Sequence, residues 1–123
     1  MKLRLNGNTL RLRLSQAEVG QLSKTGYVES KTEFGPASQF SYILETSSKA
    51  ASPQVSFQNG DLRVQVPSSE AHDWITTDRV EISGEQQSSS GKKLSILIEK
   101  DFQCIHKEHP DPGAYPNPLS KGT

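Results

Sequence analysis

Cysteine, aromatic residues and long apolar runs are all scarce in this chain of 123 residues. The single cysteine allows no disulfide within the chain, which favours a cytoplasmic protein. No apolar run approaches the ~18 residues that a membrane span requires. The N-terminal segment 1–6 alternates charged residues with leucine, unlike the continuous apolar core of a signal peptide. These absences predict a soluble, cytoplasmic protein without a membrane partner.

A net charge is also absent, because 14 acidic residues balance 14 basic ones. The balance removes any general attraction to nucleic acid or to anionic lipid, although a local basic face is compatible with it. Only 32% of the residues are apolar, so the core must be economical. The length is that of one domain, and we assign residues 1–123 to a single domain.

Alternation of apolar and polar residues is the dominant pattern and indicates half-buried strands. The predicted strands cover residues 2–5, 10–14, 27–34, 40–45, 55–57, 62–66, 79–83 and 93–99. Ser15 and Glu18 form a capping box that predicts a helix ending near Gly26. A second short helix should begin after Pro67 and bury Trp74. The aromatic residues Tyr27, Phe34, Tyr42 and Phe57 are expected to pack in the core or across strands.

The two halves of the chain repeat the same plan of hairpin, helix and two strands. Aligning residues 10–29 with 62–81 gives six identities in 20 positions, where typical residue usage would give roughly one or two. We therefore predict an internal duplication with pseudo-repeats at 2–46 and 54–100. Residues 101–123 have no copy in the first half, and their prolines suppress strand pairing. We expect them to form a C-terminal tail that covers a sheet edge or one mouth of a barrel.

These elements predict the α+β class, with about eight antiparallel strands in a barrel-like or strongly curved sheet and two short helices outside. The element order resembles that of the triphosphate tunnel (CYTH-like) superfamily, whose doubled strand–helix–three-strand unit forms a polar barrel that binds phosphorylated substrates with metal. The superfamily carries a Glu-x-Glu-x-Lys run on its first strand. In this chain that strand reads Lys2-Leu-Arg-Leu-Asn6, and the nearest match is Glu29-Ser-Lys31-Thr-Glu33.

Four segments also resemble an uncharacterised family of bacterial proteins of about this length: residues 2–14, Thr25-Gly-Tyr-Val-Glu29, Leu97-Ile-Glu-Lys-Asp-Phe102 and Tyr115-Pro-Asn-Pro118. The resemblance covers essentially the whole chain. It implies no activity and no catalytic residue.

The polar faces of the strands provide the candidate ligand-binding residues. We select Arg4, Arg11, Arg13, Arg63, Lys31 and Glu29. Arginine binds phosphate or carboxylate groups in a bidentate manner, so an enclosed face of this kind suits an anionic ligand. The alternative is a solvated sheet face with cross-strand Arg–Glu pairs, each contributing under ~1 kcal/mol.

Two further sets of residues could hold a metal ion. Glu33, Glu81 and Glu99 could bind a divalent cation inside a barrel, together with Glu29. Cys104, His106 and His109 offer thiolate and imidazole ligands for zinc, but their spacing matches no reliable zinc pattern. A small buried thiol beside two exposed histidines explains that set more simply.

Three functions are compatible with these features. The first is a small binding or accessory protein with an anionic ligand on its charged sheet face. The second is a CYTH-like, metal-dependent hydrolase of phosphorylated substrates, the one case that implies a cofactor. The third is an interaction module whose C-terminal tail binds a protein partner. No feature predicts nucleic-acid binding, because exposed aromatic residues do not alternate with basic ones.

Overall fold

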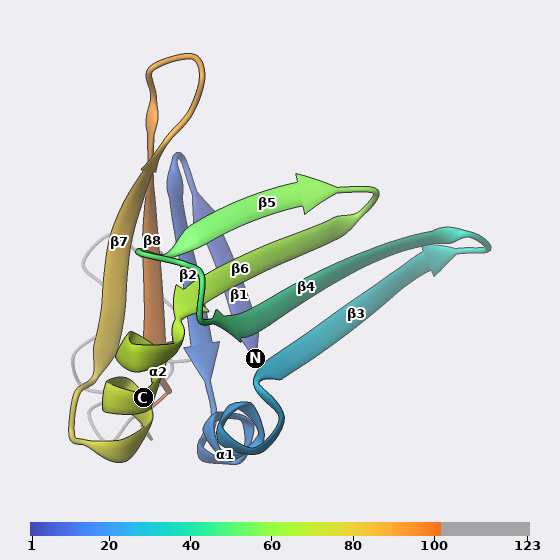
Figure 1. Ribbon diagram of the computed structural model, residues 1–123. Coiled ribbons are helices and arrows are strands. Elements are labelled where there is room, and N and C mark those ends of the chain that lie inside the picture. Colours follow the sequence, from blue (N-terminus) through green and yellow to red (C-terminus); the bar gives the residue numbers. More distant parts are fainter. Residues whose placement is uncertain (102–123) are drawn as a thin grey trace, which may run out of the picture.

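The computed structural model describes residues 1–101 of the chain (Figure 1). These residues form eight strands and two helices. In chain order they are β1 (Lys2–Asn6), β2 (Thr9–Leu14), α1 (Gln16–Thr25), β3 (Tyr27–Gly35), β4 (Ser38–Ser47), β5 (Gln54–Gln58), β6 (Asp61–Pro67), α2 (Ser68–Thr76), β7 (Glu81–Gln87) and β8 (Lys93–Lys100). The predicted elements are all present, although β7 runs four residues further than expected, through part of the predicted loop.

The strands form two four-stranded sheets, with the orders β1-β2-β8-β7 and β3-β4-β6-β5. In each sheet two antiparallel hairpins meet in a central parallel pair. The central register is also the same, because Leu12 lies opposite Ile98 in one sheet and Val64 lies opposite Leu44 in the other. Each sheet therefore combines one hairpin from the first half of the chain with one from the second. These correspondences support the internal duplication, which stays a prediction.

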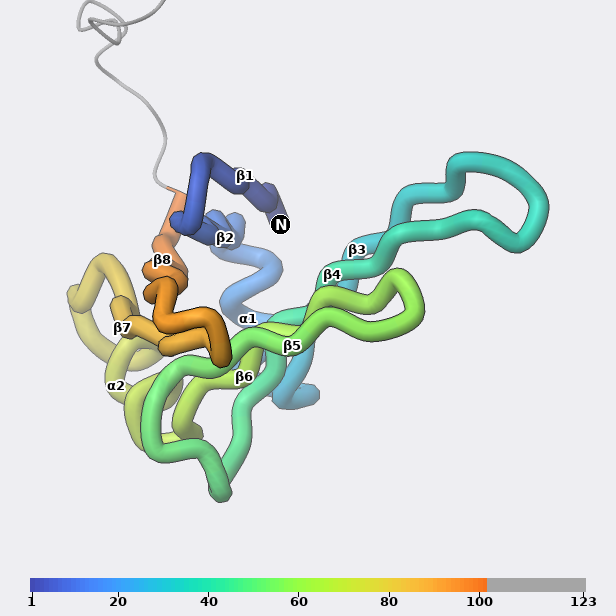
Figure 2. The backbone as a smooth tube through the Cα atoms, turned by 90° about the horizontal axis from the view of Figure 1, so that it is seen from above, coloured from blue at the N-terminus to red at the C-terminus, as the bar shows by residue number. Residues whose placement is uncertain are grey.

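The expected barrel of antiparallel strands is wrong. Two mixed sheets replace it, and within residues 1–101 neither pair of outer strands, β1 with β3 or β5 with β7, forms a backbone ladder. The strands β5 and β7 do lie side by side, but Pro53 occupies the space beside Gly84, and proline donates no backbone hydrogen bond. Figure 2 shows the other side, where β1 stands apart from β3. The α+β class itself is confirmed.

The helices lie at one end of the two sheets and close the core there (Figure 1). The predicted capping box of α1 is present, with Ser15 Oγ accepting from the Glu18 N–H and Glu18 accepting from the Ser15 N–H. Gly26 ends this helix in the left-handed conformation, as expected. In α2, the Trp74 side chain is fully buried and its Nε1 donates to the carbonyl oxygen of Val80 at 2.9 Å. No helix within residues 1–101 is both long and apolar enough to cross a membrane.

The core lies between the inner faces of the sheets and the helices. It contains the buried residues Leu10, Leu12, Leu14, Leu22, Val28, Leu44, Leu62, Val64, Val66, Ala71, Trp74, Ile82, Ile96 and Ile98. Three aromatic residues that we expected to be packed are instead exposed: Tyr27 at 49%, Phe34 at 72% and Phe57 at 61%. The reason for Phe34 is that the β3–β4 hairpin projects beyond its neighbour, since β6 begins only at Asp61, opposite Ser41.

Replacing Gly60 in the β5–β6 turn should destabilise the protein more than replacing Gly7 in the β1–β2 turn. Both glycines have a positive φ, so alanine is strained at each. A Cβ at Gly60 would also lie 2.7 Å from the carbonyl oxygen of Gln39, whereas a Cβ at Gly7 meets nothing within 4 Å. We expect Gly60→Ala to lower the melting temperature clearly further than Gly7→Ala. Equal decreases would contradict this close approach of β4 to the turn.

The capping box should make stability depend on pH. Burial raises the pKa of Glu18, but hydrogen bonds from the α-amino group of Met1 and from Ser15 outweigh it, and the net pKa lies below its usual value. The stabilisation is therefore complete at neutral pH and is lost as the pH falls through the carboxyl pKa of the folded state. Glu18→Gln should cost about 1 kcal/mol at pH 7 and less at pH 3, measured by urea unfolding. Ser15→Ala removes a hydroxyl group that does not titrate. The loss in free energy of unfolding that it causes should therefore depend less on pH.

Candidate functional site

The predicted ligand-binding residues lie on two different sheets. Arg4, Arg11 and Arg13 project from the outer face of β1-β2-β8-β7, and Arg63, Lys31 and Glu29 come from the other sheet. Both faces are open to solvent, since the side chains of Arg13 and Arg63 are 45% and 44% exposed. The residues therefore line no common tunnel.

The outer face of the β1–β2 hairpin concentrates positive charge, and we call Lys2, Arg4, Arg11 and Arg13 the cationic face. The two strands are antiparallel, and Lys2 lies directly opposite Arg13 while Arg4 lies directly opposite Arg11. Like charges in directly opposed positions of a sheet repel each other and destabilise the pair. This hairpin therefore carries an electrostatic cost that neighbouring anions must offset.

Glu99 of β8 neutralises part of the cationic face. Its Oε1 lies 3.1 Å from Arg11 Nε and 3.5 Å from Arg13 Nε. Only the contact with Arg13 has hydrogen-bond geometry, and the buried Nε–H of Arg11 points at no acceptor within the described residues. Lys2 pairs with Asp101 at 3.1 Å. Arg4 has no carboxylate within 4 Å in the described part of the chain.

An open pocket of about 280 Å³ lies at the end of this face that is remote from Glu99. Its walls are Arg4, Asn6, Thr9 and Arg11. Asn6 lies opposite Thr9 in the hairpin, next to the opposed arginines. The pocket thus combines two guanidinium groups with an amide and a hydroxyl group, and none of its walls is acidic. Such donors suit the oxygens of one phosphate or carboxylate group.

On the second sheet, Glu45 neutralises the one arginine, Arg63. Arg63 Nη1 lies 3.1 Å from both carboxylate oxygens of Glu45, and Gln65 Nε2 donates to Glu45 Oε1 at 3.0 Å. Arg63 and Glu45, together with Tyr27, Glu29 and Ile43, line a pocket of about 290 Å³. Arg63 is already satisfied by a carboxylate, and Glu29 adds negative charge, so this pocket is poorly suited to an anion.

The predicted glutamate set for a metal ion is not assembled in the described structure. Within residues 1–101 no three Asp, Glu, His or Cys side chains are grouped so that they could hold a metal ion. Glu81 lies opposite Glu99 on β7 and β8, but Glu33 lies near the end of β3 in the other sheet. Cys104, His106 and His109 fall outside the described residues, as does the predicted tail after Asp101.

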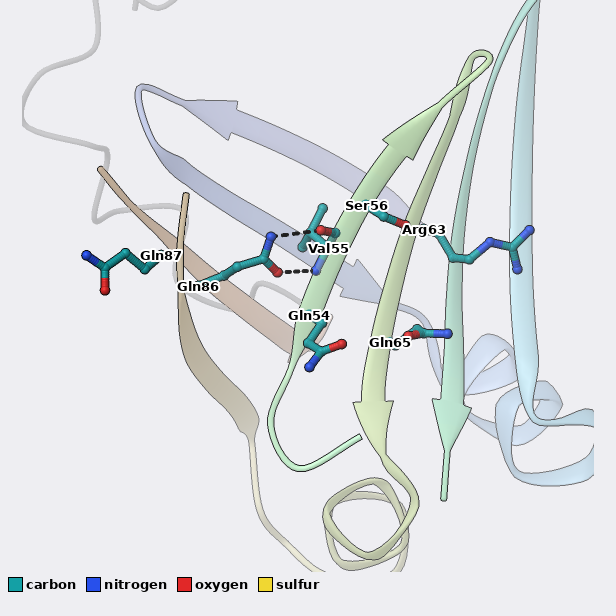
Figure 3. A pocket seen from close by; sticks show the side chains of 7 residues that line it. All are labelled: Gln54, Val55, Ser56, Arg63, Gln65, Gln86 and Gln87. Carbon is teal, nitrogen blue, oxygen red and sulfur yellow. Dashed lines mark hydrogen bonds between the residues drawn. The ribbon is translucent and has the colours of Figure 1, made fainter. Parts of the chain in front are cut away.

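Gln86 joins the two sheets where β7 runs beside β5. Its side-chain oxygen accepts from the Val55 N–H at 2.6 Å and its Nε2 donates to the Val55 carbonyl at 2.9 Å (Figure 3). One side chain thereby satisfies the outer backbone groups of Val55 as a neighbouring strand would. This junction borders an open pocket of about 330 Å³, which Gln54, Ser56, Arg63, Gln65 and Gln87 also line.

Arg79 has a comparable structural role between α2 and β7. Its guanidinium donates to Glu70, to Asp73 and to the backbone oxygen of Glu81. The hydrogen bonds that Arg79 donates, first to Glu70 and then to Asp73, raise its pKa further. Because both acids are adjacent and already paired, Arg79 is held as a link between the helix and the strand.

Sequence reasoning missed several of the residues just described, among them two walls of the pocket on the cationic face and Gln86. Asn6 and Thr9 could have been included, because strand alternation places them on the same face as the arginines. Gln86 gives no such signal. Its role depends on β5 and β7 meeting, and residues 55 and 86 are far apart in the chain.

Removing the amide of Gln86 should weaken the junction between the sheets. Gln86→Leu keeps a similar volume but leaves the Val55 N–H and carbonyl without their partner, which should cost roughly 1–3 kcal/mol in the free energy of unfolding. Gln87→Leu is the matched control, since Gln87 makes no hydrogen bond to β5 in the described structure. Denaturant unfolding measures both variants. Similar losses from the two would show that the amide contact is unimportant.

Comparisons with known proteins agree with the predicted lack of an assigned activity. A family model described as a family of unknown function (DUF7009) matches residues 1–119. No curated protein and no solved structure matches the chain. The match confirms the predicted relationship to an uncharacterised family, and it contains nothing that confirms a bacterial source or a CYTH-like relationship.

Proposed function

The chain belongs to this family of unknown function, and from the geometry of its charged residues we propose that it is a binding protein for an anionic group. The site is the cationic face of the β1–β2 hairpin, with Asn6 and Thr9 as neutral hydrogen-bond donors. The observation that carries the proposal is the direct opposition of two cation pairs, Lys2 with Arg13 and Arg4 with Arg11.

The charges within the described residues do not balance on this face. Only two carboxylates, those of Glu99 and Asp101, form ion pairs with the four cations, and Glu99 contacts two arginines. Arg4 and the Nε–H of Arg11 have no carboxylate hydrogen bond there. A bound anion would occupy the position that a second glutamate would otherwise fill. It would also relieve the repulsion between the opposed guanidinium groups.

The size of the pocket limits the ligand. A volume of about 280 Å³ lies just below the ~300–1,000 Å³ of typical small-molecule sites. It accommodates one phosphate or carboxylate group, while the rest of a larger ligand would extend over the open sheet face. Arg4 and Arg11 are the residues to which we assign the anion contact, and Arg13 remains mainly with Glu99.

Action in the cytoplasm is part of the same proposal. It is supported by the cysteine count, since one cysteine in 123 residues provides no disulfide within the chain. A reducing compartment would keep that thiol unpaired.

Binding of inorganic pyrophosphate at low ionic strength tests the anion site. Arg4→Gln should weaken binding at least tenfold, because a charge-assisted hydrogen bond contributes about 1.5–3 kcal/mol. Glu99→Gln should strengthen it, since this substitution removes the internal anion that competes for Arg11. Titration calorimetry measures the affinities.

Lys24→Gln is the matched control for these variants. It removes one positive charge from α1, away from the hairpin, and should leave the affinity nearly unchanged. Raising the salt concentration should weaken binding to the unmodified chain. If pyrophosphate binds equally well to the Arg4 and Lys24 variants, the assigned site is wrong.

A further inference from the structure

The outer edge of β1 exposes backbone groups of known direction. In the parallel pair, Ser95 N–H donates to the Asn8 carbonyl and Asp101 N–H donates to the Leu14 carbonyl. The backbone N–H and C=O groups of even-numbered β2 residues therefore point toward β8, and those of odd-numbered residues point toward β1. Since Leu12 lies opposite Leu3 and Leu10 opposite Leu5, these are the non-hydrogen-bonded pairs of the hairpin. The N–H and C=O groups of Leu3 and Leu5 consequently point away from the sheet.

On each of the other three outer strands, a side chain satisfies outward backbone groups of one residue. On β5, Gln86 binds both backbone groups of Val55. At the start of β3, the Thr25 hydroxyl donates to the Tyr27 carbonyl. At the start of β7, Arg79 Nε donates to the Glu81 carbonyl.

On β1, the comparable contact is the Tyr42 hydroxyl, which donates to the carbonyl of Met1 at 2.8 Å. This contact lies ahead of Leu3. Within residues 1–101, no strand and no side-chain hydrogen bond covers the outward groups of Leu3 and Leu5. An uncovered edge of this kind is a template for another strand.

The side chains of β1 define what a neighbouring strand should carry. Lys2 and Arg4 point to the cationic face, and Leu3 and Leu5 point to the opposite face, where Leu5 is 61% exposed. A strand added beside β1 would place successive side chains on alternate faces in the same way. Acidic residues would lie next to Lys2 and Arg4, and apolar residues next to the leucines.

Aromatic residues of the facing sheet enlarge the apolar side. Phe40 and Tyr42 on β4 are only partly buried, with ring centroids 6.0 Å apart, and the exposed ring of Phe57 lies 6.1 Å from Phe40. The hydrogen bond from Tyr42 to Met1 brings this row to the beginning of β1. Apolar side chains of an added strand would have these rings as well as the leucines to pack against.

We propose that the β1 edge binds an extended peptide with alternating acidic and apolar side chains, which becomes the fifth strand of this sheet. Backbone hydrogen bonds to Leu3 and Leu5 supply affinity, and the alternation supplies specificity. The inference rests on the proposed function, because the carboxylates of the peptide are the anions bound by Lys2 and Arg4 of the cationic face. Since β1 has five residues, the paired segment spans about five residues.

Selectively methylated peptides test the strand pairing on the full-length chain. The probe is a blocked synthetic peptide of about eight residues in which glutamate and valine alternate. Two variants carry N-methyl groups either on all valine amides or on all glutamate amides. In an antiparallel pair the valine amides face β1, and in a parallel pair the glutamate amides do. One methylated peptide should therefore lose binding at least tenfold while the other retains it.

Amide hydrogen exchange, followed by NMR, locates the contact. The unmodified peptide should protect the amides of Leu3 and Leu5, and a glutamine–valine peptide should bind more weakly. Equal affinities, or equal losses, for the two methylated peptides overturn strand pairing. Protection of the Leu3 and Leu5 amides without peptide also overturns it. Protection that is independent of protein concentration would indicate that the chain's own C-terminal segment covers the edge. Protection that increases with concentration would indicate a second copy of the chain.

Pyrophosphate separates this inference from the proposed function. If pyrophosphate binds and Arg4→Gln weakens its binding, but the glutamate–valine peptide gives no protection of Leu3 and Leu5, the anion site stands and strand pairing is wrong. If neither probe binds, both proposals are wrong. If the peptide binds with the expected methylation pattern, its affinity for the Arg4→Gln variant should be lower than for the unmodified chain. Its affinity for the Lys24→Gln variant should be unchanged.

Discussion

The architecture depends on the two central parallel pairs, β2 with β8 and β4 with β6. Each joins a strand from one half of the chain to a strand from the other, so neither half can complete a sheet alone. The side chains at their centres, Leu12, Ile98, Leu44 and Val64, are all fully buried. Burial of these residues on both sheets fixes the register, because a shift by one residue would turn the apolar side chains to solvent and the charged ones inward.

The same arrangement creates four outer strands that are protected in different ways. Between β5 and β7, Gln86 and the packing of Pro53 on Gly84 hold the sheets together. On the side of β1 and β3, the Tyr42 hydroxyl links the second sheet to the Met1 carbonyl, and beyond this contact the outward backbone groups of Leu3 and Leu5 have no partner within residues 1–101. The two sides of one repeated plan are therefore joined in different ways.

The charged faces differ for a similar reason. Arg11 and Glu99 occupy the same places in one sheet as Arg63 and Glu45 do in the other, beside the central parallel pair. In the second sheet Gln65 occupies the position that corresponds to Arg13. The carboxylate of Glu45 therefore pairs with one cation, Arg63. On the first sheet the surplus of cations over carboxylates remains for a ligand.

Alternation and capping residues in the sequence were sufficient to predict the strands, the helix after Ser15, the burial of Trp74 and the repeat of the element order, because these depend on neighbours along the chain. They also placed Arg4, Arg11 and Arg13 on one face. Alternation identifies the buried face of a strand but not the strand beside it. Only the tertiary structure therefore decided that there are two mixed sheets and that the arginines are divided between them. It also decided that Gln86 covers Val55 on one sheet edge, while Leu3 and Leu5 on another have no such partner within residues 1–101. Each depends on contacts between residues distant in the chain.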